Sequence, residues 1–340
     1  MNKKNTQLWT ASAETIKNSN IKKFSNLIEK KYNINFENNF QKLHKWSVNN
    51  LEKFWSEYWD FGEIRGDKGS QIISKDKIFH RNKFFKDSKL NFAENLLSKN
   101  NDEIAIHSLK ENGEHENISW EQLNINVKKL SSFFKFFDLK KGDRIAGYVP
   151  NTIETIVSFL ATSKNGLIWS SCSPDFGVQG VIDRFKQIEP KILVTCDQYN
   201  YNGKKIDILN RIPAILEAIP SIKKVIVFNY DRNESSNHEY ENFYKILETS
   251  NLNEEFEKFE FNHPVYILYS SGTTGVPKCI VHGSGNALIE QKKELSIHCD
   301  VKENDRVFYF TTTGWMMWNW QAAALSCGAS IYLYDGSPFF

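Results

Sequence analysis

Large apolar side chains in the first hundred residues recur three and four positions apart. In the segment 47–59, Leu51, Phe54, Trp55 and Tyr58 follow this spacing, which places them on one face of a helix. Strand-like runs are scarce before Leu97. The pattern predicts a helical amino-terminal unit over residues 1–97, in which the aromatic side chains are packing residues and have no cofactor role.

From Asn101 onwards, short apolar runs alternate with amphipathic stretches of helical period. Continuous apolar strands separated by helices are typical of parallel sheets with helices on both faces. Residues 98–340 are therefore predicted to form an α/β domain. The expected strands are 103–109, 144–149, 167–171, 191–195, 223–228, 265–269, 279–282, 306–311 and 330–334. The expected helices begin at or near 119, 151, 178, 206 and 286, and a last one runs through 322.

Local signals support several of these boundaries. Asn112-Gly113 predicts a hairpin turn, and Ser119 with Gln122 three positions later predicts a capped helix start. Residues 229–262 are polar and acidic, which indicates a surface excursion with one helix.

Composition is that of an ordinary globular protein. The 340 residues are 40% hydrophobic and 25% charged, with a formal net charge of +2. This balance gives no broad electrostatic case for nucleic acid or an anionic membrane surface. No apolar run approaches the roughly 20 residues of a membrane span, and the first residues lack the apolar stretch of a signal peptide. The five cysteines are odd in number and far apart, which favours free thiols and a cytoplasmic location.

The strongest chemical signal is the decapeptide Tyr269-Ser-Ser-Gly-Thr-Thr-Gly-Val-Pro-Lys278, between two expected strands. Glycines allow backbone amides to approach an anion closely, hydroxyls add donors, and a lysine adds positive charge. The pattern predicts a phosphate-binding loop. The candidate binding residues are Ser270, Ser271, Gly272, Thr273, Thr274, Gly275 and Lys278.

Other glycine motifs fit less well. The two loop glycines stand three apart with no Gly-Lys-Ser/Thr, so the loop is not a Walker A sequence. Gly283-x-Gly285 lacks the third glycine of a dinucleotide fingerprint. A surface turn rich in Ser, Thr and Gly is the plainer alternative, and the length of the motif between two strands argues against it.

The decapeptide resembles the phosphate loop of the adenylate-forming superfamily, which includes acyl-CoA synthetases, luciferases and peptide-synthetase adenylation domains. The resemblance implies the large amino-terminal domain of such an enzyme, with ATP, Mg²⁺ and CoA as ligands. A carboxylate would attack ATP to give an acyl-adenylate and pyrophosphate, and the thiol of CoA would then displace AMP. Thr273 and Lys278 are the catalytic candidates that this resemblance implies.

Three further stretches are similar to the acetoacetate–CoA ligases within that superfamily. They are Leu8-Trp9-Thr10-Ala11-Ser12, the aromatic segment 46–61, and Leu90-Asn-Phe-Ala-Glu-Asn-Leu-Leu97. The last is shared more loosely with acetyl- and propionyl-CoA synthetases, which remain the alternative. The resemblance therefore implies acetoacetate as the acid.

The acid pocket is expected after Gly314. Acetyl-CoA synthetases have a comparable Gly-Trp pair, so the resemblance implies that Trp315, Met316 and Met317 shape the acyl site; core packing is the alternative. Tyr201-Asn-Gly-Lys204 is also similar to acetoacetate–CoA ligases, and Lys204 is a candidate contact for CoA phosphate or else a solvated lysine.

Two further patterns, one of metal-ligating residue types and one of acidic residues, are weaker indications of a functional site. Cys279 and His282 would point to opposite faces of a strand, so no metal site is expected there. Helix capping and solvation are sufficient to explain Asp175 and Asp183.

Superfamily members continue well beyond a position equivalent to Phe340. The elements that hold adenine, ribose and Mg²⁺, and the small mobile domain with the adenylation lysine, have no counterpart in this sequence. We therefore expect a truncated chain that is inactive alone. The two hypotheses are a ligase encoded in a longer chain and a non-catalytic fragment that binds nucleotide.

Overall fold

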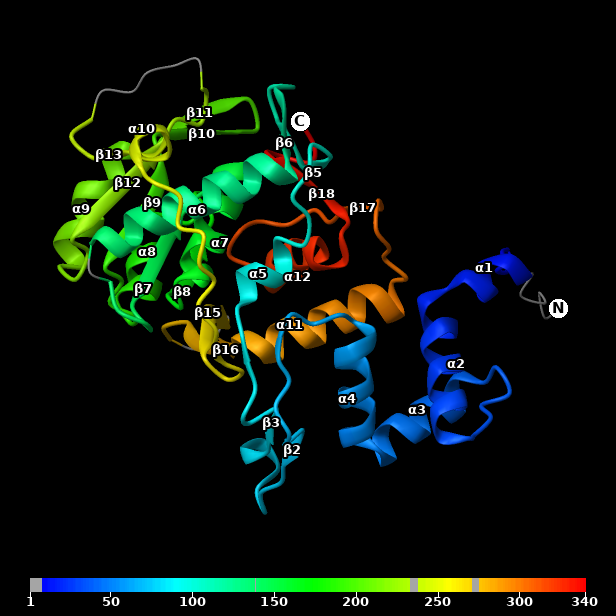
Figure 1. Cartoon of the computed structure of the whole chain (residues 1–340). Helices are drawn as coiled ribbons and strands as arrows, with labels where there is room; N and C mark the ends of the chain where they lie inside the picture. The colour runs from blue at the N-terminus through cyan, green and yellow to red at the C-terminus, as the bar shows by residue number, and fades with distance from the viewer. Residues whose placement is uncertain (1–7, 138, 233–237, 271–274) are drawn as a thin grey trace.

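The structure is a computed structural model that describes residues 8–340 except 138, 233–237 and 271–274. The amino-terminal helices α1 (Ala13–Asn18), α2 (Asn20–Tyr32), α3 (Phe40–Asn49) and α4 (Leu51–Phe61) lie together at one side of the molecule (Figure 1). Phe24 of α2 packs edge-on against Phe54 and Phe61 of α4, with ring centroids 5.7 and 5.1 Å apart. Phe24, Phe36, Tyr58 and Trp59 are buried, in agreement with the predicted packing role, whereas Trp9 and Phe40 are exposed. The helix expected over 47–59 is interrupted at Asn50, whose φ of −129° is not helical.

Residues 62–97 differ from the helical prediction. They form short strands and only one short helix, so the amino-terminal unit is not helical throughout. Strands of two residues are too short to show an alternating pattern in the sequence. The elements are β1 (Gly66–Asp67), β2 (Ile73–Ser74), η1 (Phe79–Arg81), β3 (Lys83–Phe84), β4 (Lys89–Leu90) and α5 (Phe92–Leu96). Strand β4 pairs with β14 (Phe259–Glu260) and so connects this region to a distant part of the chain.

The main sheet has seven strands in the order β13-β12-β9-β7-β8-β15-β16. All neighbours are parallel except β15 and β16. Every residue of the central strands β8 and β9 is buried, as expected for a sheet covered on both faces. The strands are β7 (Arg144–Tyr148), β8 (Ile168–Cys172), β9 (Ile192–Cys196), β12 (Lys224–Phe228), β13 (Glu241–Asn242), β15 (Pro264–Ser270) and β16 (Lys278–Gly283).

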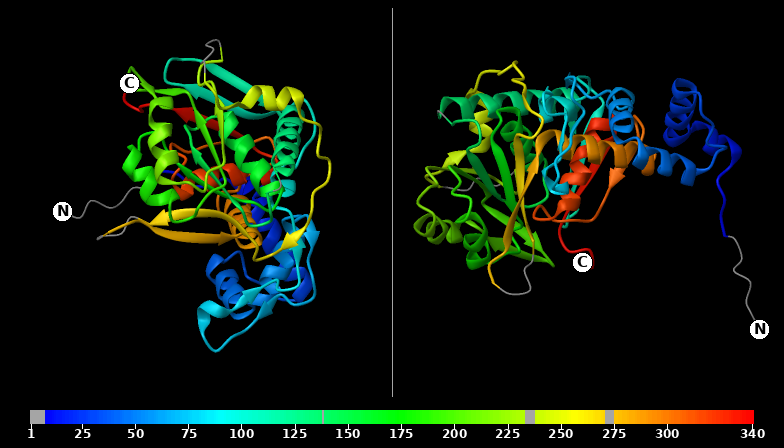
Figure 2. Two further views of the ribbon diagram at one scale, coloured as in Figure 1. Left: turned by 90° about the vertical axis from the view of Figure 1, so that its left-hand side faces the viewer. Right: turned by 90° about the horizontal axis from the view of Figure 1, so that it is seen from below.

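Helices cover the main sheet in two groups. α6 and α7 pack against each other and α6 also contacts α10, whereas α8 packs against α9. The predicted cap of α6 is present, because the Ser119 hydroxyl accepts the Gln122 N–H at 3.1 Å. The helices are α6 (Trp120–Phe136), α7 (Ile153–Lys164), α8 (Val178–Phe185), α9 (Ile212–Ala218) and α10 (Phe243–Thr249). The α/β prediction is therefore confirmed, and the views in Figure 2 show these layers beside the amino-terminal helices.

A second sheet has the order β17-β18-β5-β6. Its strands are β17 (Arg306–Phe308), β18 (Ser330–Asp335), β5 (Ile104–Lys110) and β6 (His115–Ser119). The β5–β6 hairpin turns at Gly113, whose φ is +83°, as Asn112-Gly113 predicted. α11 (Ser284–Lys293) continues into a π-helical turn, η3 (Glu294–His298); α12 (Met316–Ala323) and η4 (Ala324–Cys327) follow β17.

The predicted start of a helix near residue 206 is wrong. Residues Lys204–Asp207 form β11, which pairs antiparallel with β10 (Gln198–Tyr201). The turn η2 (Leu209–Arg211) then leads into α9. Asn202 and Gly203 both have positive φ, 51° and 70°, the conformation of a tight hairpin turn. The Asn202-Gly203 dipeptide in the sequence therefore indicates this hairpin.

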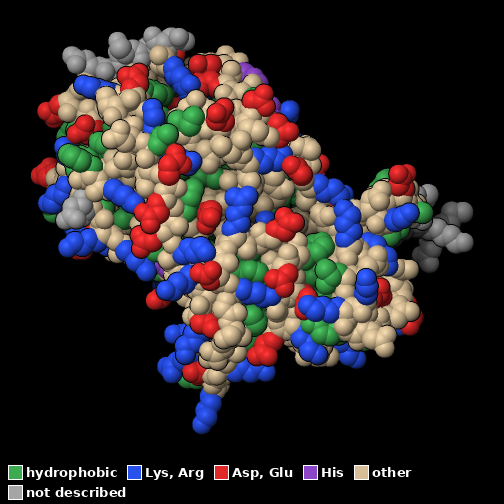
Figure 3. Space-filling view, in the orientation of Figure 1, with side chains coloured by type: hydrophobic (Ala, Val, Ile, Leu, Met, Phe, Trp, Pro, Cys, Tyr) green, Lys and Arg blue, Asp and Glu red, His purple; other side chains and the backbone are tan. Residues whose placement is uncertain are grey.

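The described surface mixes both signs of charge, as Figure 3 shows for one face. All five cysteines are unpaired; Cys172 and Cys196 are buried at strand ends, whereas Cys299 is exposed. Within the described ranges, none of the helices combines the length and the apolarity that a bilayer crossing requires.

Candidate active site

The candidate site lies where the parallel strands of the main sheet end. Strands β7, β8 and β15 run in the same direction, so the segments after Tyr148, Cys172 and Ser270 leave the sheet at one edge. Ligands of open α/β sheets bind at this carboxyl edge, where loops present polar groups that the strands hold in place.

The predicted phosphate loop connects β15 and β16, which pair antiparallel at the edge of the main sheet. Ser270, the last residue of β15, pairs directly with Lys278, the first residue of β16. The strand–loop–strand setting is therefore as expected. Gly275 has a φ of +99°, a conformation that favours glycine. Lys278 is exposed, and the remaining predicted residues, Ser271, Gly272, Thr273 and Thr274, lie outside the described residues.

Neighbouring elements fix the two ends of this hairpin. The Ser170 hydroxyl on β8 donates to the Ile267 carbonyl at 2.9 Å and lies 3.1 Å from the Tyr269 hydroxyl. The Gln187 amide, just after α8, donates to the Pro277 carbonyl at 2.8 Å. The guanidinium of Arg184 lies over the Phe176 ring at 4.2 Å. The loop thus begins and ends on positions that α8 and β8 support.

A cavity of about 290 Å³ lies beside this edge, between the two sheets. The Ser171 hydroxyl donates to the Thr313 carbonyl at 2.7 Å, and the Thr313 hydroxyl donates to the Val149 carbonyl at 2.8 Å. These bonds join the segment after β17 to the ends of β7 and β8. The lining residues are Asn151, Ser173, Pro174, Asp175, Tyr199, Tyr201, Phe310–Thr313, Tyr334–Gly336, Pro338 and Phe339.

Two carboxylates line the cavity, and neither was predicted from the sequence to belong to a binding site. Asp175 accepts the Ser173 hydroxyl at 2.7 Å and the Tyr199 hydroxyl at 3.1 Å, so it is part of the cavity wall and not only a solvated cap. Asp335 accepts the Tyr230 hydroxyl at 2.8 Å. Burial raises the pKa of Asp335 to about 6. Its only sequence signal is an acidic residue at the end of an apolar strand.

The residues predicted to shape the acid pocket lie next to this cavity but do not line it. Trp315 precedes α12 and is 62% exposed, and Met316 is 47% exposed. Gly314 is close to the end of β8, since a Cβ there would lie 3.7 Å from the Ser171 carbonyl oxygen. The three side chains therefore lie at the correct edge of the sheet, and their role in acid binding remains a prediction.

Lys204 lies on the β10–β11 hairpin and is exposed. Its cross-strand partner Tyr201 lines the cavity. The carboxylate of Glu111 accepts the backbone N–H groups of Asn202 and Gly203 at 2.9 and 2.6 Å, and that of Ser337 at 2.5 Å. Glu111 therefore holds this hairpin against the segment that follows β18, at the rim of the cavity.

The described residues contain no group of three or more His, Cys, Asp or Glu side chains placed to hold a metal ion. Cys279 and His282 lie on β16, paired with Tyr269 and Tyr266. Mg²⁺ bound to a nucleotide is held by substrate phosphates with one or two carboxylates and does not require a cluster of three such side chains.

Comparisons with known proteins agree with this geometry. The family model described as AMP-binding enzyme matches residues 92–340. The acetoacetyl-coenzyme A synthetase of Rhizobium meliloti (strain 1021) is 38% identical over 338 residues, which are 98% of this chain and 51% of that protein. The acetoacetyl-CoA synthetase of Xenopus tropicalis is 39% identical over 347 residues, with 97% of this chain and 51% of that protein covered.

A solved structure, acetoacetyl-CoA synthetase from Streptomyces lividans, superposes with a TM-score of 0.92 at 33% identity, over 98% of this chain and 52% of that one. The chain thus spans about half the length of the relatives it matches. Because the family model covers most of its residues, this chain belongs to the AMP-binding enzyme family.

Proposed function

We propose that this chain provides the ATP- and acid-binding part of an acid–thiol ligase that converts acetoacetate, ATP and CoA to acetoacetyl-CoA, AMP and pyrophosphate. The observation that carries the proposal is the position of the Ser/Thr/Gly hairpin loop. It begins at Ser270 and ends at Lys278, at the carboxyl edge of the main sheet and beside a cavity that Asp175 and Asp335 line. The names of the relatives supply the acid.

In the first step, the carboxylate of the acid attacks the α-phosphorus of ATP and pyrophosphate leaves. This displacement requires the phosphates to be positioned and their charge to be neutralised more than it requires a proton shuttle. We assign that role to the backbone amides and hydroxyls of residues 270–275, with Thr273 as a donor to the phosphates and the Lys278 ammonium as a positive charge. Mg²⁺, when bound to the phosphates, would add further charge neutralisation.

In the second step, the thiol of CoA attacks the acyl carbonyl and AMP leaves. The cavity beside the loop, with Tyr201 in its wall, is our candidate route for the thiol arm. We assign the Lys204 ammonium on the same hairpin, which is exposed, to contact with a CoA phosphate. The unpaired cysteines fit a reducing compartment, so we keep the cytoplasm as the proposed location.

Trp315, Met316 and Met317 are proposed to wall the acid site. An indole limits the size of a small pocket, and thioethers adapt to a chain longer than acetate. Acetoacetate differs from butyrate only in a carbonyl group at its third carbon. A site that donates a hydrogen bond to this carbonyl should discriminate strongly against butyrate, because the donor would otherwise stay unpaired.

The test measures pyrophosphate release with ATP, Mg²⁺ and CoA, using the longest protein that the gene encodes around this chain. Acetoacetate, butyrate and acetate are compared at equal concentrations. We expect acetoacetate to be used fastest. Faster turnover of acetate would assign the chain to an acetyl- or propionyl-CoA synthetase. ATP binding without turnover of any acid would support the non-catalytic alternative.

A further inference from the structure

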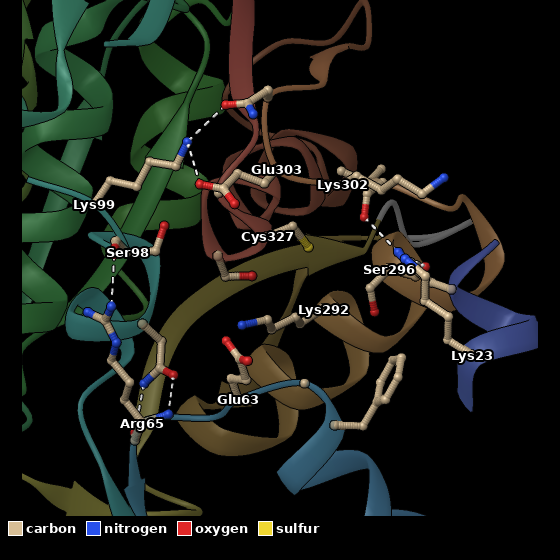
Figure 4. Close-up of a pocket in the computed structure, with 18 residues that line it drawn as sticks. Lys23, Glu63, Arg65, Ser98, Lys99, Lys292, Ser296, Lys302, Glu303 and Cys327 are labelled. Atoms are coloured by element: carbon tan, nitrogen blue, oxygen red, sulfur yellow. Dashed lines mark hydrogen bonds and ion pairs between the residues drawn. The ribbon is translucent and has the colours of Figure 1, made fainter. Parts of the chain in front are cut away.

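A second, larger cavity lies between the amino-terminal helices and the rest of the molecule, away from the hairpin loop. Its volume is about 840 Å³, which is within the range of small-molecule sites. It is lined by α2, by the turn after α4, and by α11 with its π-helical turn (Figure 4). Segments 95–99, 301–304 and 326–328 complete it.

The walls are fixed by hydrogen bonds between distant segments. The backbone N–H of Asn20 donates to the Asp300 carboxylate at 2.7 Å, and the Tyr58 hydroxyl lies 2.9 Å from the Ser296 hydroxyl. The Arg65 guanidinium donates to the Ser98 carbonyl at 2.8 Å. The cavity is thus part of the folded arrangement of these six segments and is not a gap between loosely placed parts.

Basic side chains outnumber acidic ones around the cavity. Its basic residues are Lys23, Arg65, Lys99, Lys292 and Lys302, and its acidic residues are Glu63 and Glu303. Lys99 pairs with Glu303 at 3.1 Å, and Lys302 pairs with Asp300 at 2.7 Å. Within the described part of the chain, the positive charges of the other three basic residues are not matched by a direct ion pair.

Lys292 is the central cation of this set. Its ammonium points into the cavity, between Glu63 and Cys327 (Figure 4). Among the described residues, the ammonium groups of Lys292 and Lys23 form no hydrogen bond or ion pair; Lys292 is partly buried, whereas Lys23 is exposed at the rim. Burial lowers the pKa of Lys292, and the neighbouring Cys327 and Glu63 offset part of this effect. A desolvated ammonium without a partner is unfavourable unless an anion joins it.

We propose that this cavity binds a small molecule that carries phosphate groups, held by the ammonium groups of Lys292 and Lys23. Lysine ammonium groups act as point charges that suit phosphate. The Arg65 guanidinium already donates to the carbonyls of Glu94, Leu97 and Ser98, so it offers no free fork for a carboxylate. A ligand in this position would contact α2 and α11 together and so join the amino-terminal helices to the AMP-binding domain.

The test measures binding of pyrophosphate by titration calorimetry to the unmodified protein and to four variants. Lys292→Gln and Lys23→Gln remove one cavity cation each. Lys293→Gln is the matched control, because Lys293 is the next residue of α11 but pairs with Glu290 at 3.7 Å and does not line the cavity. Lys278→Gln reports on the hairpin loop.

We expect pyrophosphate to bind in two classes of site, the cavity and the hairpin loop. Lys292→Gln and Lys23→Gln should each weaken the cavity class by roughly tenfold or more, the effect of losing a charge-assisted hydrogen bond. Lys293→Gln and Lys278→Gln should leave that class unchanged. Thermal unfolding without ligand controls for folding, and Lys292→Gln should not lower the midpoint, since it removes an unpaired charge. If pyrophosphate binding depends on Lys278 alone, all of it occurs at the hairpin loop and the proposal is overturned. Citrate binding at the cavity as tightly as pyrophosphate would also overturn it. If pyrophosphate binding depends on Lys292 and Lys23 but none of it depends on Lys278, the result counts against the proposed function and not against this cavity.

Discussion

The carboxylate of Asp335 accepts a hydrogen bond of 2.9 Å from the backbone N–H of Asn151, so the end of β18 in the smaller sheet is joined to the segment after β7 in the main sheet. The side chain of Asn151 continues the connection, because it accepts the Trp318 indole N–H at 2.9 Å. The two sheets therefore meet at the candidate cavity through a carboxylate whose pKa is raised by burial.

Replacing Asp335 with Asn should change how stability depends on pH. The pKa rises from its ordinary value of 3.8 to about 6 in the folded chain, so the folded state binds more protons than the unfolded state between these values. Stability is therefore lost as the pH rises through this window. Asp335→Asn should be more stable than the unmodified chain at pH 7.5, by on the order of 1–3 kcal/mol, and nearly equal to it at pH 4.

Urea denaturation at both pH values provides the measurement. Asp102→Asn, at an exposed position, is the matched control and should show no such difference. A gap between Asp335→Asn and the unmodified chain that stays constant with pH would contradict the assignment.

Lys110 is a buried charge, and we expect the stability of the folded chain to depend on it. Its side chain is 5% exposed and pairs with Glu114 and Glu116, both at 3.0 Å. It also donates to the Tyr230 carbonyl. Lys110→Met leaves these acceptors without their cation, and we expect the free energy of unfolding to fall by about 3 kcal/mol.

Lys224 provides the comparison for this prediction. It pairs with Glu241 at the same distance, 3.0 Å, but its side chain is 40% exposed. Lys224→Met should lower the free energy of unfolding by less than about 1 kcal/mol. Similar losses in both variants would show that burial does not determine the contribution of Lys110.

Thr273→Ala tests the assignment of the hairpin loop. Removing one donor to developing charge reduces rates by roughly 10²–10³, so acid-dependent pyrophosphate release should fall by that factor while the thermal midpoint is nearly unchanged. Thr249→Ala, on the exposed end of α10, should leave the rate intact. Normal adenylation by Thr273→Ala would show that this hydroxyl does not assist the first step.

Glu111→Ala separates the two steps of the proposed reaction. Without its three backbone contacts, the hairpin that carries Lys204 should lose its fixed position. The KM for CoA should rise on the order of tenfold, whereas pyrophosphate release in the absence of CoA should stay unchanged. Glu111→Gln keeps an acceptor oxygen and should recover part of the loss. An unchanged KM for CoA would remove the basis for placing CoA at this rim.

Local patterns were sufficient for the buried strands and for the setting of the hairpin loop, because continuous apolar runs and a Ser/Thr/Gly segment are visible over a few residues. They were insufficient for the two-residue strands of the segment 62–91, where no period can develop. The β10–β11 hairpin was missed although Asn202-Gly203 signalled it. Asp335 and Lys292 gain their importance from burial among segments far away in the sequence, which no local pattern reports.

The hydrogen bond between the Asn20 N–H and the Asp300 carboxylate joins residues 280 positions apart. During synthesis, the amino-terminal helices leave the ribosome long before the segment that they pack against. At about 5–20 residues per second, the delay is roughly 15–55 s. α2, whose Phe24 and Ile28 are buried in the complete fold, lacks its contact with η3 during this interval. We therefore expect nascent chains that stop before residue 300 to expose this apolar surface and to engage chaperones.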